Sequence, residues 1–360
     1  MPSMDESWQM RNGMEIPNRS VLAAMTNKQS HSDGRLSDDE IGFLLRRAEG
    51  GFGIITTAAS HVQKSGQGWE GEFGVWSDHH LPGLTDLAMN LKKYDSRSFV
   101  QIFHGGMRAP SSLTGQQPCS ASENFISENE GHSRALTIEE VEETIRDFID
   151  AAKRCESAGF DGVELHGAHG YLIAQFLGTN TNRRIDRFGG TVEERCEFLL
   201  NIIRGIRAVV RPDFAIMVRL SPVSDEIGIT LEETKQVIGL LIEEDIDAVH
   251  ISCWDVFDVQ DNGQTVTHEI CSTFSDSIPI VSTGSVWTAD DAQFVLDEGA
   301  QAVGVARVAL PHPDWPSLVT NSNLDPSRPP FSPEELLQAD LSPVFVDYMR
   351  RWKGFVTDGR

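Results

Sequence analysis

The chain has 360 residues, and its 54 acidic against 30 basic side chains give a formal net charge of −24. This charge repels nucleic acid and anionic membrane surfaces, so we expect neither as a partner. No apolar run approaches the ~18 residues of a membrane span, and the N-terminus lacks a signal-peptide pattern, so we expect a cytoplasmic protein. The five cysteines are widely spaced and form no disulfide or metal-binding pattern.

Strand-like and helix-like patterns alternate along the whole chain. Short β-branched or apolar runs predict strands at residues 21–24, 53–57, 98–103, 162–166, 215–220, 248–252, 280–283 and 302–306. Amphipathic patterns predict helices at residues 37–49, 81–93, 137–158, 191–210, 231–244 and 288–298. This alternation is typical of a (β/α)8 TIM barrel; a doubly wound sheet, which usually has fewer strands, is the alternative.

The pattern predicts a single α/β domain over residues 1–360. Residues 1–20 are expected to form a short lid over the N-terminal end of the barrel, and residues 340–360 a C-terminal tail. Residues 108–133, which are rich in glycine, serine and glutamine, are expected to form a long loop after the third strand.

Two imidazoles and a phenol follow the fourth predicted strand, at the end where parallel α/β proteins bind their ligands. His166 and His169 can hold a carbonyl oxygen, and Tyr171 can give up a proton. A zinc site would need further ligands at a characteristic spacing, and none completes the set, so we predict no metal. Two structural histidines remain the alternative.

The last two predicted strands end in small residues. Gly284 and Ser285 follow the seventh strand, and Ala306 and Arg307 close the eighth. Backbone N–H groups at such ends often hold a phosphate in barrels, and Arg307 supplies the positive charge that a phosphate needs on so acidic a chain. A tight turn explains Gly284 equally well.

Gln101 and Arg219 are expected to point into the barrel mouth from the third and fifth strands. An arginine there can stabilise an anionic ring, and a glutamine amide can pair with an imide edge. An isoalloxazine ring has both features. The alternatives are a buried ion pair for Arg219 and a polar plug for Gln101.

Taken together, these motifs resemble the old yellow enzyme family of FMN-dependent NAD(P)H ene-reductases over nearly the whole chain. The resemblance lies in residues 18–26, 166–177, 182–195, 283–286, 307 and 311–316. It implies non-covalent FMN, NAD(P)H as the reductant and a small electron-poor alkene as the substrate. The implied reaction is a ping-pong reduction of the C=C bond of an α,β-unsaturated carbonyl or related compound. Hydride would come from flavin N5 and a proton from Tyr171.

The resemblance also assigns roles to single residues. His166 and His169 would grip the substrate oxygen, and Tyr171 would be the proton donor. The residues implied to contact FMN are Ala24, Met25, Thr26, Ala59, Gln101, His166, Arg219, Gly284, Ser285, Ala306 and Arg307. Two positions depart from the family pattern, because Ala24 stands where proline is usual and Ala306 where glycine is usual. The methyl group of Ala306 could crowd the phosphate.

Two other functions remain open. One is a flavin oxidase or quinone reductase without alkene chemistry, and the other is a flavin-free barrel that binds a different phosphorylated ligand. The oligomeric state is also open between a monomer, a homodimer and a homotetramer. Arg350 or Arg351 in the tail would reach a neighbour's pocket, as the resemblance implies, or would form an exposed basic helix end.

Overall fold

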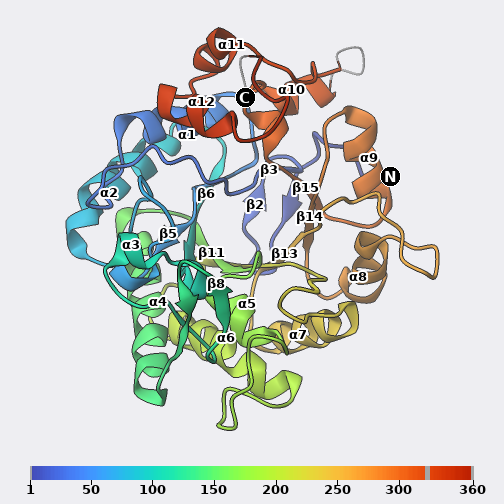
Figure 1. Cartoon of the computed structure of the whole chain (residues 1–360). Coiled ribbons are helices and arrows are strands. Elements are labelled where there is room, and N and C mark those ends of the chain that lie inside the picture. Colours follow the sequence, from blue (N-terminus) through green and yellow to red (C-terminus); the bar gives the residue numbers. More distant parts are fainter. Residues whose placement is uncertain (1, 321–324, 358–360) are drawn as a thin grey trace.

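The computed structural model describes residues 2–320 and 325–357; Met1 of the predicted lid and residues 358–360 of the predicted tail lie outside them. Within the described residues, eight parallel strands close into a barrel, because β15 pairs with β3 (Figure 1). The strands are β3 (Ser20–Leu22), β4 (Ile54–Thr56), β6 (Arg97–Phe103), β11 (Gly162–Gly167), β12 (Ala215–Leu220), β13 (Ala248–Ser252), β14 (Ile280–Thr283) and β15 (Ala302–Val305). The predicted TIM barrel is confirmed, and the closure excludes a doubly wound sheet.

Helices surround the strands on the outside of the barrel (Figure 1). They are α1 (Asp38–Glu49), α2 (Leu81–Leu91), α4 (Ile138–Ala158), α6 (Val192–Arg207), α7 (Leu231–Glu243), α8 (Val266–Phe274) and α9 (Ala289–Asp297). Capping boxes begin α4 and α6, where Thr137 and Thr191 each exchange hydrogen bonds with a glutamate three residues later. Helix α8 was not predicted, because its nine residues carry β-branched side chains and only a short apolar stripe. None of the described helices is long and apolar enough to cross a membrane.

The N-terminal segment closes the bottom of the barrel. Strands β1 (Trp8–Gln9) and β2 (Glu15–Ile16) form an antiparallel hairpin. Trp8, Met10 and Ile16 are buried against the lowest side chains inside the barrel, which are Val21, Ile54, Phe99, Ala215, Met217, Ala248, Val281 and Ala302. The hairpin is the predicted lid, and its apolar floor leaves the C-terminal end of the barrel as the place for a ligand.

A polar layer lies directly above this floor. Side chains two positions further along a strand point to the same face, so the layer above the apolar floor includes Gln101, Glu164, Arg219, His250, Thr283 and Gly304. The side chains of this layer are buried or nearly so. The side chains that face the barrel interior are therefore apolar at the floor and mostly polar nearer the mouth.

The predicted long loop after β6 has local structure of its own. It contains the short helix α3 (Ser111–Thr114) and the strands β7 (Cys119–Ser120), β8 (Phe125–Ser127) and β9 (Gly131–His132). The predicted long connection between the third strand and the next predicted helix is present, but its short internal elements were not predicted. Turns and two-residue strands are too short to leave a periodic pattern in the sequence.

The C-terminal segment packs on the outside of the barrel. Helices α10 (Trp315–Thr320), α11 (Pro333–Gln338) and α12 (Pro343–Met349) are red in Figure 1; α10 contacts α9, and α11 contacts α12. Phe345 of α12 meets Phe43 of α1 edge to face, with ring centroids 5.3 Å apart. The tail is thus joined to the barrel by a buried apolar contact.

Candidate active site

The three predicted catalytic side chains lie together at the C-terminal end of β11. The rings of His166 and His169 are centred 5.0 Å apart, and the ring of Tyr171 lies 5.0 Å from that of His166. His169 and Gly170 have left-handed backbones, with φ of 58° and 70°, which reverse the chain directly after the strand. This reversal brings the phenol of Tyr171 back beside the imidazole of His166, near the end of β11.

Hydrogen bonds hold the turn in a conformation that a histidine rarely adopts. His169 N donates to Ser221 Oγ at 3.0 Å, and Arg108 Nη1 donates to His169 O at 2.5 Å. Gln175 Nε2 donates to Gly170 O at 2.8 Å. The positions of the two histidines and the tyrosine are therefore fixed by the surrounding framework.

The buried imidazole and the phenol are both uncharged at neutral pH. Burial, together with the neighbouring His169 and Arg219, lowers the pKa of His166 far below its ordinary value. Burial raises the pKa of Tyr171 to about 12, against the opposing charge of Arg108. One N–H and one O–H are consequently available as hydrogen-bond or proton donors.

An aromatic wall stands beside Tyr171. The ring of Trp69 stacks on Phe103 at 5.4 Å and lies 6.5 Å from the ring of Tyr171. The loop that carries Trp69 is held by the buried side chain of Glu72, which accepts a hydrogen bond from Gly68 N at 2.9 Å and whose Oε1 lies 2.7 Å from His61 Nδ1. Glu72 was not among the residues predicted from the sequence.

Arg219 lies next to His166 on the neighbouring strand and joins distant parts of the chain. Its Nη1 donates to Ala24 O at 3.3 Å, and its Nη2 donates to Ser252 Oγ at 3.0 Å, which lies 2.9 Å from His169 Nε2. Arg219 Nε is buried and has no hydrogen-bond partner among the described residues. Within the same residues it forms no ion pair. A buried guanidinium with an unused N–H fits the anionic edge of a bound ring.

Gln101 lies beneath the mouth and is bonded to a carboxylate that the sequence analysis passed over. Its Nε2 donates to Glu164 Oε1 at 2.6 Å, and His250 Nδ1 donates to Glu164 Oε2 at 2.7 Å. His250 Nε2 lies 2.6 Å from Thr283 Oγ1. Burial alone would raise the pKa of Glu164, but His250, Arg219 and the hydrogen bonds outweigh burial and lower it. Glu164 is therefore ionised. Its position as a charged residue inside a predicted buried strand could have identified it as a functional residue from the sequence.

A cavity of about 390 Å³ extends from Arg219 to the ends of β14 and β15. Its walls include the four residues expected to bind phosphate, Gly284, Ser285, Ala306 and Arg307. Gly284 has no room for a side chain, because a Cβ there would lie 2.7 Å from Cys253 O. Ala306 has a φ of −125°, outside the left-handed region, so its own backbone accepts the methyl group.

The remaining predicted cofactor residues lie at the ends of the first two barrel strands. Met25 and Thr26 follow β3 and are half-buried, and Ala59 follows β4 and is buried. The bond from Arg219 to Ala24 O connects this edge to the opposite side of the mouth. The predicted residues thus surround one opening, although they are spread over most of the sequence.

The cysteines and acidic side chains form no second reactive centre in the part of the chain that is described. There, all five cysteines are free, and no group of three His, Cys, Asp or Glu side chains is arranged to hold a metal ion. Burial raises the pKa of Cys253, the one beside the cavity, to about 11, so its thiol is neutral.

Comparison with known proteins assigns this barrel to a family. The chain matches the NADH:flavin oxidoreductase / NADH oxidase family over residues 8–325. It belongs to that family. The probable NADH-dependent flavin oxidoreductase YqiG of Bacillus subtilis is 34% identical over 319 residues, which are 86% of this chain and 86% of the relative. The NADH oxidase of Thermoanaerobacter brockii is 34% identical over 325 residues, 84% of this chain but only 48% of that longer relative.

Solved structures of the NADH:flavin oxidoreductase family have the same fold. An old yellow enzyme homologue from Zymomonas mobilis superposes with a TM-score of 0.82 and 24% identity, covering 96% of this chain and 99% of the other. Morphinone reductase in complex with tetrahydroNAD superposes with a TM-score of 0.80 and 25% identity, covering 93% and 94%. The protein is therefore an NAD(P)H-dependent flavin oxidoreductase of the old yellow enzyme type, with FMN as its flavin.

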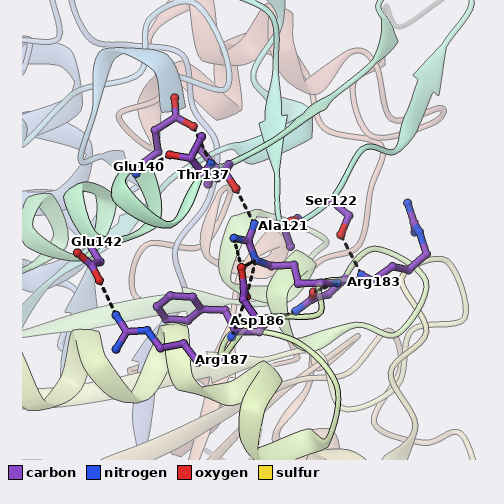
Figure 2. Close-up of polar contacts among 12 residues, drawn as sticks. Ala121, Ser122, Thr137, Glu140, Glu142, Arg183, Asp186 and Arg187 are labelled. Atoms are coloured by element: carbon purple, nitrogen blue, oxygen red, sulfur yellow. Dashed lines mark hydrogen bonds and ion pairs between the residues drawn. The ribbon is translucent and has the colours of Figure 1, made fainter.

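The stretch 182–195, which resembles this flavin oxidoreductase family closely, supports the site from outside. Arg184 Nη1 donates to Ala121 O at 2.9 Å, within the loop after β6, and to Leu136 O at 2.6 Å, just after that loop. Figure 2 shows Arg183 beside Ser122 and Arg187 reaching Glu142 of α4, at 2.7 Å. Residues 182–195 therefore connect the loop after β6 to the outer wall of the barrel through hydrogen bonds and an ion pair.

The tail arginines contact their own helix in the single chain. Arg351 lies over the rings of Tyr348 and Trp352, at 5.0 and 4.9 Å, and Arg350 Nη1 lies 3.3 Å from Asp347 Oδ1. The reach of either arginine into a neighbouring subunit stays a prediction, as does the oligomeric state.

Proposed function

We propose that this flavin oxidoreductase reduces the activated C=C bond of α,β-unsaturated carbonyl compounds and related electron-poor alkenes. The observation that carries the proposal is the cluster of three rings at the mouth of the barrel. The His166 ring is centred 5.0 Å from the His169 ring and 5.0 Å from the Tyr171 ring. Two imidazoles and a neutral phenol offer what an enone needs, namely donors for its oxygen and a proton for its carbon.

The residues around the cavity would hold FMN. Arg219, with its unused Nε, would face the anionic edge of the ring, and Gln101 would pair with the pyrimidine edge. Gly284, Ser285, Ala306 and Arg307 would hold the phosphate, since they line the opposite end of the same cavity. Thr26 and Ala59 would line the ring from the first two strands. When bound, FMN supplies a hydride that originates from NAD(P)H.

The chain's own groups would bind, polarise and protonate the alkene. His166 and His169 would donate hydrogen bonds to its carbonyl or nitro oxygen and stabilise the negative charge that develops there. Loss of one such donor typically costs about 3–4 kcal/mol of barrier. Tyr171 would transfer its proton to the α-carbon, and its raised pKa keeps that proton in place at neutral pH.

A second candidate function is reduction of oxygen or quinones, which the relative named NADH oxidase favours. Rapid mixing separates the two. Enzyme reduced anaerobically by NADPH or NADH is mixed with 2-cyclohexenone or with air-saturated buffer, and flavin reoxidation is followed by absorbance. We expect the alkene to reoxidise the wild-type enzyme faster than oxygen does.

The Tyr171→Phe variant tests the assigned proton donor in the same instrument. We expect unchanged reduction by the nicotinamide and reoxidation by the alkene slowed by about 10²- to 10⁴-fold, the usual contribution of a positioned acid. Equal slowing of both half-reactions would refute the role of Tyr171, and a wild-type alkene rate no faster than the oxygen rate would refute the function.

A further inference from the structure

Arg328 lies at the far end of the cavity but belongs to none of the predicted motifs. It follows the residues 8–325 that match the family. Arg328 and Pro329 nevertheless line the same cavity of about 390 Å³ as Gly284, Ser285 and Arg307. A segment outside the barrel strands therefore contributes a cation to the end of the cavity where a phosphate is expected.

The barrel itself fixes the position of this segment. Trp287 Nε1 donates to Pro326 O at 3.2 Å and to Ser327 O at 3.1 Å, and His312 Nε2 donates to Ser327 O at 2.9 Å. The guanidinium of Arg328 lies 5.7 Å from the centre of the Trp287 ring. Trp287 is buried and follows Ser285 by two positions, so one turn after β14 shapes the cavity wall and anchors Arg328.

The charges at this end of the cavity are not neutralised by the protein. Arg307 and Arg328 are both exposed, and within residues 2–320 and 325–357 neither forms an ion pair with a carboxylate. On a chain of net charge −24, these two cations provide local positive potential that an anion needs. A phosphate monoester carries about −1.5 to −2 charges at pH 7, and guanidinium groups bind it with two parallel hydrogen bonds. Two arginines match that charge better than one.

We propose that Arg328 is a second phosphate-binding arginine of the FMN site, which acts together with Arg307. The inference rests on the proposed placement of FMN in this cavity. It also accounts for Ala306, which stands where the family resemblance expects glycine. A methyl group limits how closely the backbone approaches the phosphate, and a second guanidinium restores the attraction from the open side.

The test compares FMN with riboflavin, which has the same ring system but no phosphate. Full-length protein is freed of flavin, and the dissociation constant of each flavin is measured by quenching of flavin fluorescence. We expect Arg328→Gln to weaken FMN binding by about 10- to 100-fold, the usual effect of losing a hydrogen bond to a charged group. Riboflavin binding should stay unchanged, and Arg328→Lys should give an intermediate FMN affinity.

Arg146→Gln is the matched control, because Arg146 is an exposed arginine on the outer helix α4 and its loss changes the net charge equally. It should leave both dissociation constants unchanged. The inference fails if Arg328→Gln leaves FMN affinity intact, if FMN and riboflavin weaken equally, or if Arg146→Gln matches its effect. A wild-type protein that binds FMN no better than riboflavin would instead overturn the proposed phosphate site as a whole. The rapid-mixing experiment tests alkene reduction independently, so the proposed reaction can fail while the FMN-binding role of Arg328 holds, and the reverse.

Discussion

The side-chain amide of Gln101 donates to the carboxylate of Glu164 at 2.6 Å, directly beneath the barrel mouth. A carboxylate only accepts hydrogen bonds, so the amide nitrogen must face Glu164 on the neighbouring strand, and the amide oxygen remains for another partner. Glu164 also holds His250 at 2.7 Å and is buried. The orientation of a predicted flavin contact is thus set by a neighbour on the next strand.

Glu164→Gln should make the bound flavin easier to reduce. The change removes a buried negative charge close to the ring and lets the amide of Gln101 turn over. We expect the two-electron reduction potential to rise by roughly 30 mV or more, which is about 1.4 kcal/mol. Potentiometric titration against a reference dye measures it, and Glu164→Asp, which keeps the charge, should stay near the wild-type value. An unchanged potential in Glu164→Gln would contradict the expectation.

The alkene half-reaction should not decline in moderately alkaline solution. Tyr171 donates its proton only while it is protonated, and burial raises its pKa to about 12. The donor is therefore lost as pH rises through about 12, and the wild-type rate of reoxidation by an enone should stay level from about pH 7 to 10. Single-turnover rates across this range provide the check. A falling limb centred near the ordinary pKa of about 10 would show that the phenol is not shielded.

His166→Ala should weaken the binding of phenols that perturb the spectrum of the oxidised flavin. The imidazole is neutral because its pKa lies far below the ordinary value, so it binds the ligand as an N–H donor. We expect a loss of about 1.5–3 kcal/mol, or roughly 10- to 150-fold in the dissociation constant. A titration with para-hydroxybenzaldehyde followed by long-wavelength absorbance measures it, and a wild-type affinity in the variant would count against the site.

Arg108 should favour alkenes that carry an acid group. Its guanidinium lies 5.6 Å from the centre of the Tyr171 ring, and it makes no ion pair with any described carboxylate. We expect 4-oxo-2-pentenoate to have a lower KM than its methyl ester by about 2- to 5-fold, the worth of an exposed ion pair. Arg108→Gln should remove the difference between acid and ester; because it also loses the hydrogen bond to His169 O, a cost common to both substrates reports on the turn. Equal effects on acid and ester would assign Arg108 to the turn alone.

Phe198→Ala should destabilise the fold without touching the mouth. The Phe198 ring is buried on α6, stacks on Phe176 at 4.2 Å and meets Phe148 edge to face at 6.2 Å. Truncation of such a side chain costs about 3–5 kcal/mol, because the cavity only partly collapses. Urea unfolding of the holoprotein measures the loss, and a cost below about 1 kcal/mol would show that this packing is dispensable.

Much of the barrel could be predicted because its strands are buried on both faces. The largely apolar runs of β12 and β13 are read directly from the sequence despite Arg219 and His250, and their predicted ends agree with the structure. Helix α8 was missed because its stripe is short, and the segments between β7 and β9 because two-residue strands have no period. These elements depend on contacts with the rest of the fold.

The site was predicted unevenly for a similar reason. His166, His169 and Tyr171 are close in sequence, so one motif revealed all three. Glu164 was read as part of an apolar run, although its position two residues before His166 places it on the same inner face. Arg328 could not be found at all, because its place in the wall of the same cavity as Arg307 depends on Trp287, a tryptophan in a different turn.

The hairpin that closes the base of the barrel leaves the opposite end as the way in. With Trp8 and Ile16 filling the floor, a ligand reaches the barrel interior from the C-terminal end of the strands. Under the proposed function the nicotinamide and the alkene both approach the flavin through that end and compete for the same space. A large excess of either compound would then inhibit the reaction of the other, which steady-state rates at high concentrations of both would reveal.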